Sequence, residues 1–589
     1  MFIPTTLQEV KNRGWNSLDI ILISGDTYTD NSYNGTALIG HWLIDHGYKV
    51  GIIAQPDVNS DKDITRLGQP DLFWSVSAGC VDSMVANYTP TRKFRKDDDF
   101  TPGGINNRRP DRATISYTNL IKKYIKGKPI FLSGIEASLR RVVHYDYWSD
   151  SLRRSVLFDS KADGIIYGMT ELATLEVADA IRKGTDWRET RGVAYVSNEA
   201  PSDSIVMPSF EDCISDKDAF RRAFIIFRNN NDPVSGKNLV QGHGNRWLVQ
   251  NRPQRNLTTQ ELDSLYGSDF ENEVHPYYSK FGHVKAMDTV KNSITTHRGC
   301  YGGCSFCAIA AHQGKHVISR SAESIVSEVE RMAKKPGFNG IIQDVGGPTA
   351  NMYEIDCLIK KNRGACKEKR CLGRHVCENL FVNHASQIKL LEDISSIPGV
   401  KKVFVNSGIR YDLILADKLN GDRYLETIVK NHVSGQMKVA PEHVCDRVLD
   451  LMGKPMCSEL LEFRSKFMEA TAKIGKEQYL TYYFIAAHPG CTKENMKELS
   501  DFCHNYLKTN PEQVQMFTPT PSTESTMMFY TKSDARGRPI FCEKSIQGMH
   551  QQKDLVVVSK TNKVYKGEQH KKKVECHTNQ ARKRQSRKV

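Results

Sequence analysis

Short apolar runs that alternate with helical patterns dominate the first 200 residues. The run at 19–26 ends at a Gly-Asp pair, the segment 34–47 has apolar residues around most of a helical circumference, and 49–56 is apolar again. Further apolar runs follow at 73–79, 129–134, 164–169 and 193–198. Such alternation is typical of a parallel sheet with helices on both faces. We therefore predict an α/β fold over 1–204, a doubly wound parallel sheet with ligand-side loops at its carboxyl edge.

The next segment, 205–285, has weaker periodicity and many turn residues, including NNNDPVSGKN and NRPQRN. Clusters of Asn, Asp, Gly and Pro favour loops over regular elements. We predict that this segment connects two domains.

A second alternation begins after Met287 and predicts a core domain over 286–535. Its helix at 321–335 has Ser321 at the N-cap position and Ile325, Val329 and Met332 on one face. Six strands precede helices or loops, at 293–297, 340–345, 402–407, 436–441, 480–486 and 514–519. Six βα units are too few for a complete eight-stranded barrel. We expect a partial, TIM-type (β/α)6 barrel whose strand-end loops share one mouth.

Composition agrees with a multidomain globular protein. The chain has 589 residues, of which 39% are hydrophobic and 25% charged, and a core of this length is usually divided among domains. It contains no apolar run of the roughly 20 residues that cross a bilayer, and its first residues do not resemble a secretory signal. We expect a cytoplasmic protein without membrane contact.

The net charge of +14 is concentrated at the C-terminus. Residues 560–589 contain eleven Lys or Arg and two Glu, so this segment alone carries +9. We predict a C-terminal extension, 536–589, that ends in a basic, disordered tail. The tail would either follow the phosphates of a nucleic acid or only increase solubility.

Seven of the fifteen cysteines lie between Cys300 and Cys377. Cys300, Cys304 and Cys307 follow the first barrel strand within HRGCYGGCSFCAIAAHQGK. Three thiolates on one glycine-containing loop can hold three irons of a [4Fe-4S] cluster and leave the fourth open to a small-molecule chelator. The alternative is a zinc knuckle completed by His297 or His312.

A second group, Cys357, Cys366, Cys371 and Cys377, lies in the basic connection between the second and third strands. Four thiols within 21 residues of a polar loop predict a metal site in a reducing compartment. Zinc and an auxiliary iron–sulfur cluster both accept four thiolates, so the two remain open. His375 and His384 are substitute ligands.

The spacing C-x3-C-x2-C with Phe306 before the last cysteine resembles the signature of the radical S-adenosylmethionine (SAM) superfamily. The phrases GIEASLRRVVHYDYWSD, DVGGPTANMY, MKVAPEH and FTPTPSTEST narrow this resemblance to YgiQ-type radical SAM proteins, an uncharacterised family. The resemblance covers about 1–535. It implies an N-terminal domain similar in outline to cobalamin-binding domains, one [4Fe-4S] cluster, SAM, and an electron donor such as flavodoxin or ferredoxin.

The same resemblance implies roles for strand-end residues. Phe306 would pack near the adenine, and the backbone of Gly346 and Gly347 would meet the amino group of SAM, although Pro348 stands where the superfamily often has an acid. Ser407, Arg410 and Glu442 would contact ribose hydroxyls or the carboxylate, or Arg410 and Glu442 would pair with each other. The Asp-x-His-x-x-Gly cobalamin motif is absent, since the first loop reads DNSYNG at 30–35.

The sequence therefore predicts a radical SAM enzyme that cleaves SAM reductively to a 5′-deoxyadenosyl radical. Its substrate is open: RNA, protein or a small molecule, with methyl or sulfur transfer as a variant of the chemistry. After Thr531 we expect no RNA-binding module of the kind that methylthiotransferases append. The rival hypothesis is a non-catalytic zinc protein whose basic tail binds nucleic acid.

Overall fold

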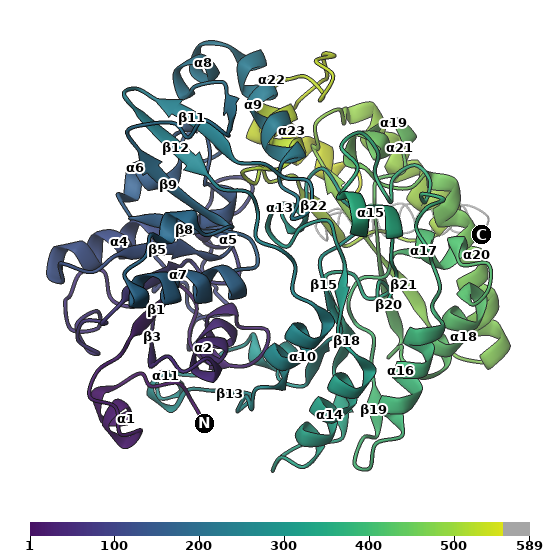
Figure 1. The fold of residues 1–589 in the computed structure, drawn as a ribbon. Helices are drawn as coiled ribbons and strands as arrows, with labels where there is room; N and C mark the ends of the chain where they lie inside the picture. The colour runs from purple at the N-terminus through teal and green to yellow at the C-terminus, as the bar shows by residue number, and fades with distance from the viewer. Residues whose placement is uncertain (558–589) are drawn as a thin grey trace, which may run out of the picture.

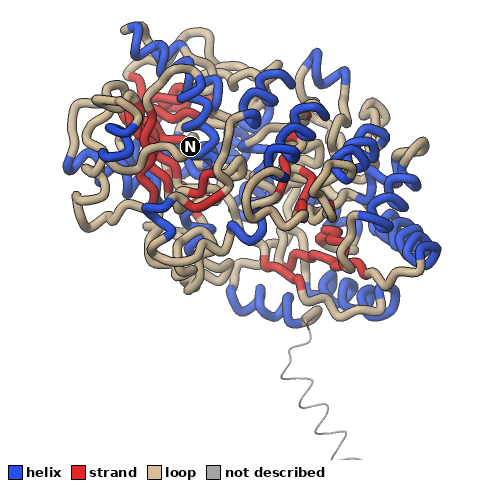
Figure 2. Tube along the Cα trace, turned by 90° about the horizontal axis from the view of Figure 1, so that it is seen from below, coloured by secondary structure: helices blue, strands red, loops and turns tan. Residues whose placement is uncertain are grey.

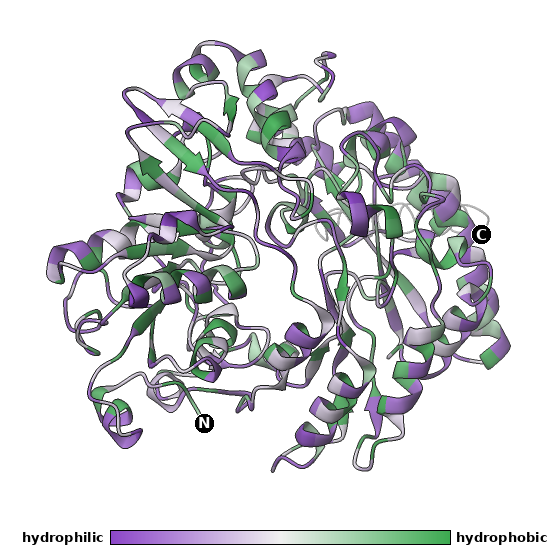
Figure 3. Cartoon of the chain, viewed as in Figure 1, coloured by the Kyte–Doolittle hydropathy of each residue, from purple (hydrophilic) through white to green (hydrophobic). Residues whose placement is uncertain are grey.

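The computed structural model describes residues 1–557 and consists of a sheet-based N-terminal part and an open barrel (Figure 1). The predicted C-terminal basic tail lies outside the described residues. Figure 2 shows the strands of both parts on the inside and helices mostly outside them. Hydropathy follows the same division, with apolar strands and mixed outer helices (Figure 3).

A nine-stranded sheet organises the N-terminal part, in the order β10-β11-β12-β9-β8-β5-β4-β1-β3. The five strands from β3 to β8 are parallel. The strands are β1 (Ile20–Ser24), β3 (Val50–Ala54), β4 (Phe73–Ser77), β5 (Ile130–Ser133), β8 (Gly164–Ile166), β9 (Val193–Ser197), β10 (Ile205–Met207), β11 (Leu239–His243) and β12 (Arg246–Gln250). The doubly wound prediction is confirmed for this parallel portion.

Helices cover both faces of the sheet because its strands are apolar on both sides. In β1, Ile21 and Ile23 face one core while Ile20 and Leu22 face the other. The first core is covered by α4 (Ala113–Tyr124) and α9 (Lys217–Asn229), the second by α2 (Gly35–Asp45), α7 (Glu171–Lys183) and α10 (Thr259–Gly267). Shorter helices in this part are α1 (Leu7–Asn12), α3 (Ser83–Asn87), α5 (Gly134–Leu139), α6 (Val156–Ser160), α8 (Phe210–Ser215), α11 (Pro276–Ser279) and α12 (Met287–Val290).

Two expectations about this part need correction. β9 runs antiparallel to β8 and to β12, so the sheet is mixed. The segment expected to connect two domains, 205–285, supplies β10, β11 and β12 and thereby extends the sheet. These three strands are only three to five residues long, which is why the local pattern favoured a loop. Two small ladders, β2 (Thr29–Asp30) with β13 (Glu273–Val274) and β6 (His144–Asp146) with β7 (Ser151–Arg153), complete the part.

Parallel strands form the barrel in chain order. They are β14 (Ser293–Thr295), β17 (Ile341–Ile342) continuing as β18 (Asp344–Gly346), β19 (Lys402–Val403), β20 (Gln436–Glu442), β21 (Tyr479–Ala486) and β22 (Gln513–Met516). β14 pairs with β18, β17 with β19, β20 with β21, and β21 with β22; a parallel bridge from Ile409 to Val439 links the third strand end to β20. In the described residues β14 and β22 are the two edges, so the barrel is open, as the partial (β/α)6 prediction requires.

The outer helices follow from amphipathic segments. Ser321 caps α14 (Ala322–Ala333) by accepting from the Ser324 amide, and Ile325, Val329 and Met332 are buried, as predicted. The other helices are α13 (Ile309–His312), α15 (Leu358–Arg363), α16 (Ala385–Ser395), α17 (Tyr411–Ala416), α18 (Gly421–Asn431), α19 (Asp446–Met452), α20 (Cys457–Ile474), α21 (Lys493–Phe502), α22 (Glu524–Thr531) and α23 (Ile546–Asp554).

The two parts share one apolar core. Met527, Met528 and Phe529 of α22 are buried in the same cluster as Phe220 and Phe224 of α9. Met549 of α23 joins this cluster too. Part of the predicted C-terminal extension, 536–557, therefore belongs to the folded body of the protein. Within the described residues, no helix combines the length and the apolar character needed to span a membrane.

Candidate functional site

The three-cysteine loop begins at the barrel mouth, one short hairpin strand beyond β14. β15 (His297–Arg298) pairs with β16 (Ile318–Ser319), and the loop lies between them. Gly299 has φ 78°, and a Cβ there would lie 1.7 Å from the His316 carbonyl oxygen. Only glycine fits such a close approach, so the tight turn that brings the cysteines together depends on it.

The thiols of Cys300 and Cys304 border a common space. The Gly302 amide donates to Cys300 Sγ at 3.3 Å, and a guanidinium nitrogen of Arg410 lies 3.7 Å from Cys304 Sγ. A Cβ on Gly302 would be 3.3 Å from Cys300 Sγ and 3.5 Å from Cys304 Sγ. The glycine therefore leaves room between the thiols, which is what a shared cluster requires.

Burial makes the thiols of Cys300 and Cys307 poor anions on their own. It raises the pKa of Cys300 and, together with the neighbouring Cys304, raises that of Cys307 to about 12. A bound metal centre reverses this balance because its positive charge stabilises thiolates. Among the described residues, no group of three or more His, Cys, Asp or Glu is placed to hold one metal ion. A [4Fe-4S] cluster differs from such a site because each thiolate binds a separate iron.

Arg410 directs one end of its guanidinium at the cysteine loop. Its Nε and Nη2 donate to the two carboxylate oxygens of Asp412 at 2.8 and 2.6 Å, which leaves Nη1 toward Cys304 Sγ. Burial alone would lower the pKa of Arg410, but Asp412 raises it, so the group is a permanent cation. The ion pair with Glu442 considered from the sequence does not form.

Glu442 pairs instead with Lys454, whose Nζ lies 3.7 Å from its carboxylate. The register of β20 against β21 shifts between Val439 and Glu442, and Glu442 has φ 70°. A bulge with left-handed backbone at a non-glycine residue is strained and redirects the side chain. Burial raises the pKa of Glu442.

The second and third strand ends are tied to each other. The Ser407 amide donates to Asp344 Oδ1 at 3.0 Å, and the Ser407 hydroxyl donates to the other carboxylate oxygen. The Ser407 hydroxyl is thus already engaged. Gly346 accepts from the Thr296 amide at 2.7 Å, and a Cβ on Gly347 would be 2.7 Å from the His297 ring.

Phe306 lies where the two parts of the molecule meet. It packs against the core that the two parts share and against the separate core of the barrel, and its ring is 6.2 Å from that of His488 at 84°. His488 and His443 are fully buried, and burial lowers the pKa of each to about 3. Neither histidine nor Asp412 had a role predicted from the sequence, although each follows a predicted strand.

Matches to protein families cover most of the chain. The model for the radical SAM N-terminal domain matches residues 2–293, and the radical SAM superfamily model matches 294–503. A UPF0313 protein of Fusobacterium nucleatum is 53% identical over 565 residues, 95% of this chain and 100% of the relative. One of Thermotoga neapolitana is 48% identical, over 95% of this chain and 99% of the relative. The chain belongs to the UPF0313 family of the radical SAM superfamily.

The chain is accordingly a radical SAM enzyme, and membership implies an iron–sulfur cluster and SAM. The family matches do not support the rival hypothesis of a non-catalytic zinc protein. Two solved structures are also similar to the chain. The methyltransferase TsrM from Kitasatospora setae, with cobalamin and a [4Fe-4S] cluster, has a TM-score of 0.47 at 13% identity, covering 86% of this chain and 77% of TsrM. The cobalamin-dependent enzyme OxsB has a TM-score of 0.49 at 12% identity, covering 89% and 57%.

The second cysteine group of this UPF0313 protein is only partly assembled. Cys357, Cys371 and Cys377 belong to one small core, and the Cys377 amide donates to the Cys371 carbonyl at 2.8 Å. Cys366 is exposed and lines a cavity that Cys371, Cys304 and Cys307 also border. His384 Nδ1 donates to the Asp417 carboxylate and its Nε2 accepts from Asn351 Nδ2, while His375 is largely exposed.

Proposed function

We propose that the protein cleaves SAM reductively at a [4Fe-4S] cluster held by Cys300, Cys304 and Cys307. The observation that carries this proposal is the glycine-lined space between two of these thiols, with the Arg410 guanidinium beside it. When bound, the cluster supplies one electron to SAM and yields methionine and a 5′-deoxyadenosyl radical. An electron donor such as flavodoxin or ferredoxin supplies the electron.

The chain's own residues orient the reactants. The backbone at Gly346 and Gly347 is the proposed contact for the amino group of SAM, because Gly346 ends β18 and Gly347 follows it against His297, beside the cysteine loop. Phe306 is the proposed adenine-side residue, and the neighbouring His488, uncharged by burial, keeps that region apolar. Glu442, held at the mouth by its bulge, is the proposed acceptor for ribose hydroxyls.

Arg410 acts on the thiolates in this proposal. A cation 3.7 Å from Cys304 Sγ stabilises negative charge on the sulfur. Ser407 supports the site by fixing the third strand to Asp344. From the sequence, both residues were expected to contact SAM itself. In this proposal Arg410 contacts a cluster ligand and Ser407 contacts Asp344 instead.

We also propose that Cys357, Cys366, Cys371 and Cys377 bind a second metal centre. The Lys360 side chain supports this because it is 4% exposed, donates to the Lys315 carbonyl at 2.8 Å and lies over the Tyr301 ring. No carboxylate of the described residues forms an ion pair with this buried ammonium, and thiolates in the same core would compensate its charge. Cys366 has to move toward the other three for this site to form.

The decisive test compares Cys304→Ala with Cys213→Ala, which removes a buried thiol of the N-terminal part. Anaerobically reconstituted wild-type protein and Cys213→Ala should contain about four iron and four sulfide in the first site and form 5′-deoxyadenosine when reduced with SAM. Cys304→Ala should remain soluble and form none. Product formation by Cys304→Ala would refute the proposed cluster ligand. Cys371→Ala should keep the iron and sulfide of the first cluster and lose the metal of the second centre, whether that metal is iron with sulfide or zinc.

A further inference from the structure

A second cavity lies between the N-terminal sheet and the barrel. Its volume is about 460 Å³, and it is lined by the carboxyl ends of β1, β4 and β5, by the start of α7, and by Thr295, His297, Gly347 and Pro348 of the barrel. In the sheet order β1 lies between β3 and β4. The chain passes from β1 to β3 on one side and then returns to β4 on the other, so the strand order reverses at β1. Ligands of parallel α/β sheets bind in the crevice at such a switch point.

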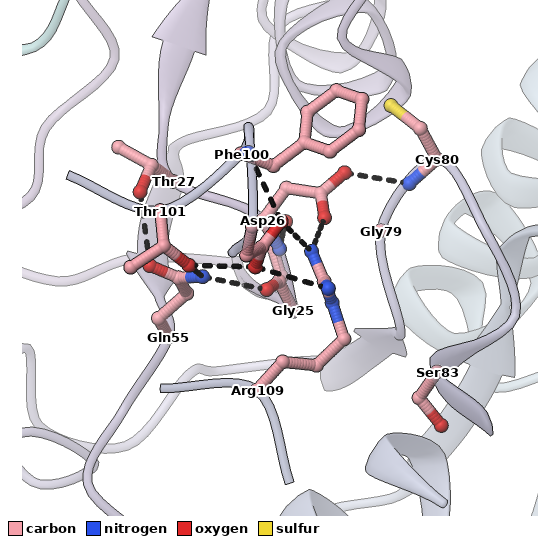
Figure 4. Close-up of polar contacts among 12 residues, drawn as sticks. Gly25, Asp26, Thr27, Gln55, Gly79, Cys80, Ser83, Phe100, Thr101 and Arg109 are labelled. Carbon is pink, nitrogen blue, oxygen red and sulfur yellow. Dashed lines mark hydrogen bonds and ion pairs between the residues drawn. The ribbon is translucent and has the colours of Figure 1, made fainter. Parts of the chain in front are cut away.

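The charged groups around this cavity are paired within the protein. Arg298 is the one Lys or Arg of the described lining, and it forms a buried ion pair with Glu171. Asp26 is bound by Arg109 at 2.5 Å and by the Cys80 amide at 2.6 Å (Figure 4), and Arg109 also reaches Asp98 at 3.0 Å. A phosphate would find no free cation here, whereas nucleic-acid binding requires several.

Hydroxyl groups and one apolar wall supply the remaining contacts. Ser75 and Ser133 hydrogen-bond to each other at 3.0 Å on the sheet side, and Ser77 lies beside them. Apolar side chains of the same lining come from β1 and α2, among them Leu38 and Ile39. One side of the cavity thus suits hydroxyl groups, and another suits the face of a ring.

His297 offers a hydrogen bond that the protein does not use. The residue is 0% exposed, its Nδ1 lies 2.8 Å from Thr296 Oγ1, and its Nε2 has no hydrogen-bond partner. The Nε2 edge faces Gly347, which lines the cavity with it. A buried polar atom without a partner costs about 1–3 kcal/mol, so a ligand that reaches it gains binding energy.

We propose that this cavity binds an uncharged, hydroxyl-bearing small molecule with one apolar ring face, a nucleoside in its simplest form. Gly347 and Pro348 border both this cavity and the proposed SAM contact, so the molecule lies beside SAM; that placement rests on the proposed function. Binding itself does not depend on it. Such a molecule could be either the substrate or a second cofactor, since the same contacts would bind both.

Equilibrium dialysis of the reconstituted full-length protein with saturating SAM tests the site, using radiolabelled uridine and inosine and their 5′-monophosphates as probes. The nucleosides should bind about tenfold or more tightly than their monophosphates, because a phosphate would be buried without a cation. Ile39→Trp fills the cavity from α2 and should weaken nucleoside binding about tenfold. Ile44→Trp, on the same helix but outside the lining, should not.

His297→Phe provides a second, independent variant. It should weaken nucleoside binding about tenfold while leaving the thermal stability of the ligand-free protein equal or higher, because it removes an unpaired buried nitrogen. A histidine that only supports the fold would give lower stability. Equal binding of nucleosides and monophosphates, no nucleoside binding at millimolar concentration, or no effect of Ile39→Trp and His297→Phe overturns the proposal.

Two further measurements separate this proposal from the previous one. Ile39→Trp should still form 5′-deoxyadenosine from SAM, because Ile39 lies on the N-terminal side. Wild-type protein that binds nucleosides but forms no 5′-deoxyadenosine would refute the proposed function alone. After turnover, consumption of the bound nucleoside in proportion to 5′-deoxyadenosine assigns the site to a substrate, and its intact recovery assigns it to a cofactor; either result supports the site.

Discussion

The pair Arg410–Asp412 predicts opposite changes in the reduction potential of the proposed cluster. Arg410→Gln removes a cation 3.7 Å from Cys304 Sγ. At an effective dielectric constant of about 20, unit charges about 4 Å apart interact by about 4 kcal/mol. Asp412 keeps its charge in both proteins and does not change this difference. A loss of about 4 kcal/mol corresponds to about 170 mV for one electron, so Arg410→Gln should lower the potential by up to about that amount.

Asp412→Asn should raise the potential, since it removes the anion and leaves the cation. Anaerobic redox titration followed by electron paramagnetic resonance measures both changes. Arg423→Gln, at a side chain that is 62% exposed, is the control and should leave the potential unchanged. Shifts of the same sign in both variants, or no shift in either, would show that Arg410 does not act electrostatically on the cluster.

Three further predictions concern SAM binding and stability. Gly347→Ala should abolish SAM binding in equilibrium dialysis, because its Cβ would lie 2.7 Å from a buried imidazole, while Gly408→Ala, with open space, should bind normally; equal affinities would contradict the glycine contact. Phe529→Ala should cost about 3–5 kcal/mol of unfolding free energy and lower the thermal midpoint of both parts together; two separate transitions would disprove a shared core. Burial alone would raise the pKa of Asp417, but the hydrogen bonds to His384 outweigh burial and lower the pKa to about 2. This stabilisation is complete above the unfolded pKa near 4 and is lost as pH falls toward 2. Asp417→Asn should therefore flatten the pH dependence of urea unfolding between pH 4 and 2, and an unchanged slope would refute this.

Local patterns sufficed for the order of elements after Met287 and for the cysteine loop, but not for the strands of 205–285. The strand–helix alternation after Met287 predicted the open barrel because each element has its own apolar periodicity. The loop was predicted because Cys300, Cys304 and Cys307 are close in sequence, so their proximity in space depends on one turn. The ligand roles of these cysteines stay a prediction.

Long-range partners were beyond the reach of the sequence. The orientation of β9 depends on its pairing with β8 and β12, and no local signal encodes it. The pairing of Glu442 with Lys454 depends on a bulge in β20. Asp412 is different: an acid two residues after Arg410 was visible in the sequence and could have been weighed as its partner.

The shared core has a consequence for biosynthesis. The apolar surface of α9 is covered by Met527, Met528 and Phe529, which the ribosome adds about 300 residues later. At a translation rate of about 5–20 residues per second, the α9 surface stays exposed for roughly 15 to 60 seconds. The nascent N-terminal part therefore exposes the apolar surface of α9, and we expect a chaperone to bind this surface until α22 has been synthesised.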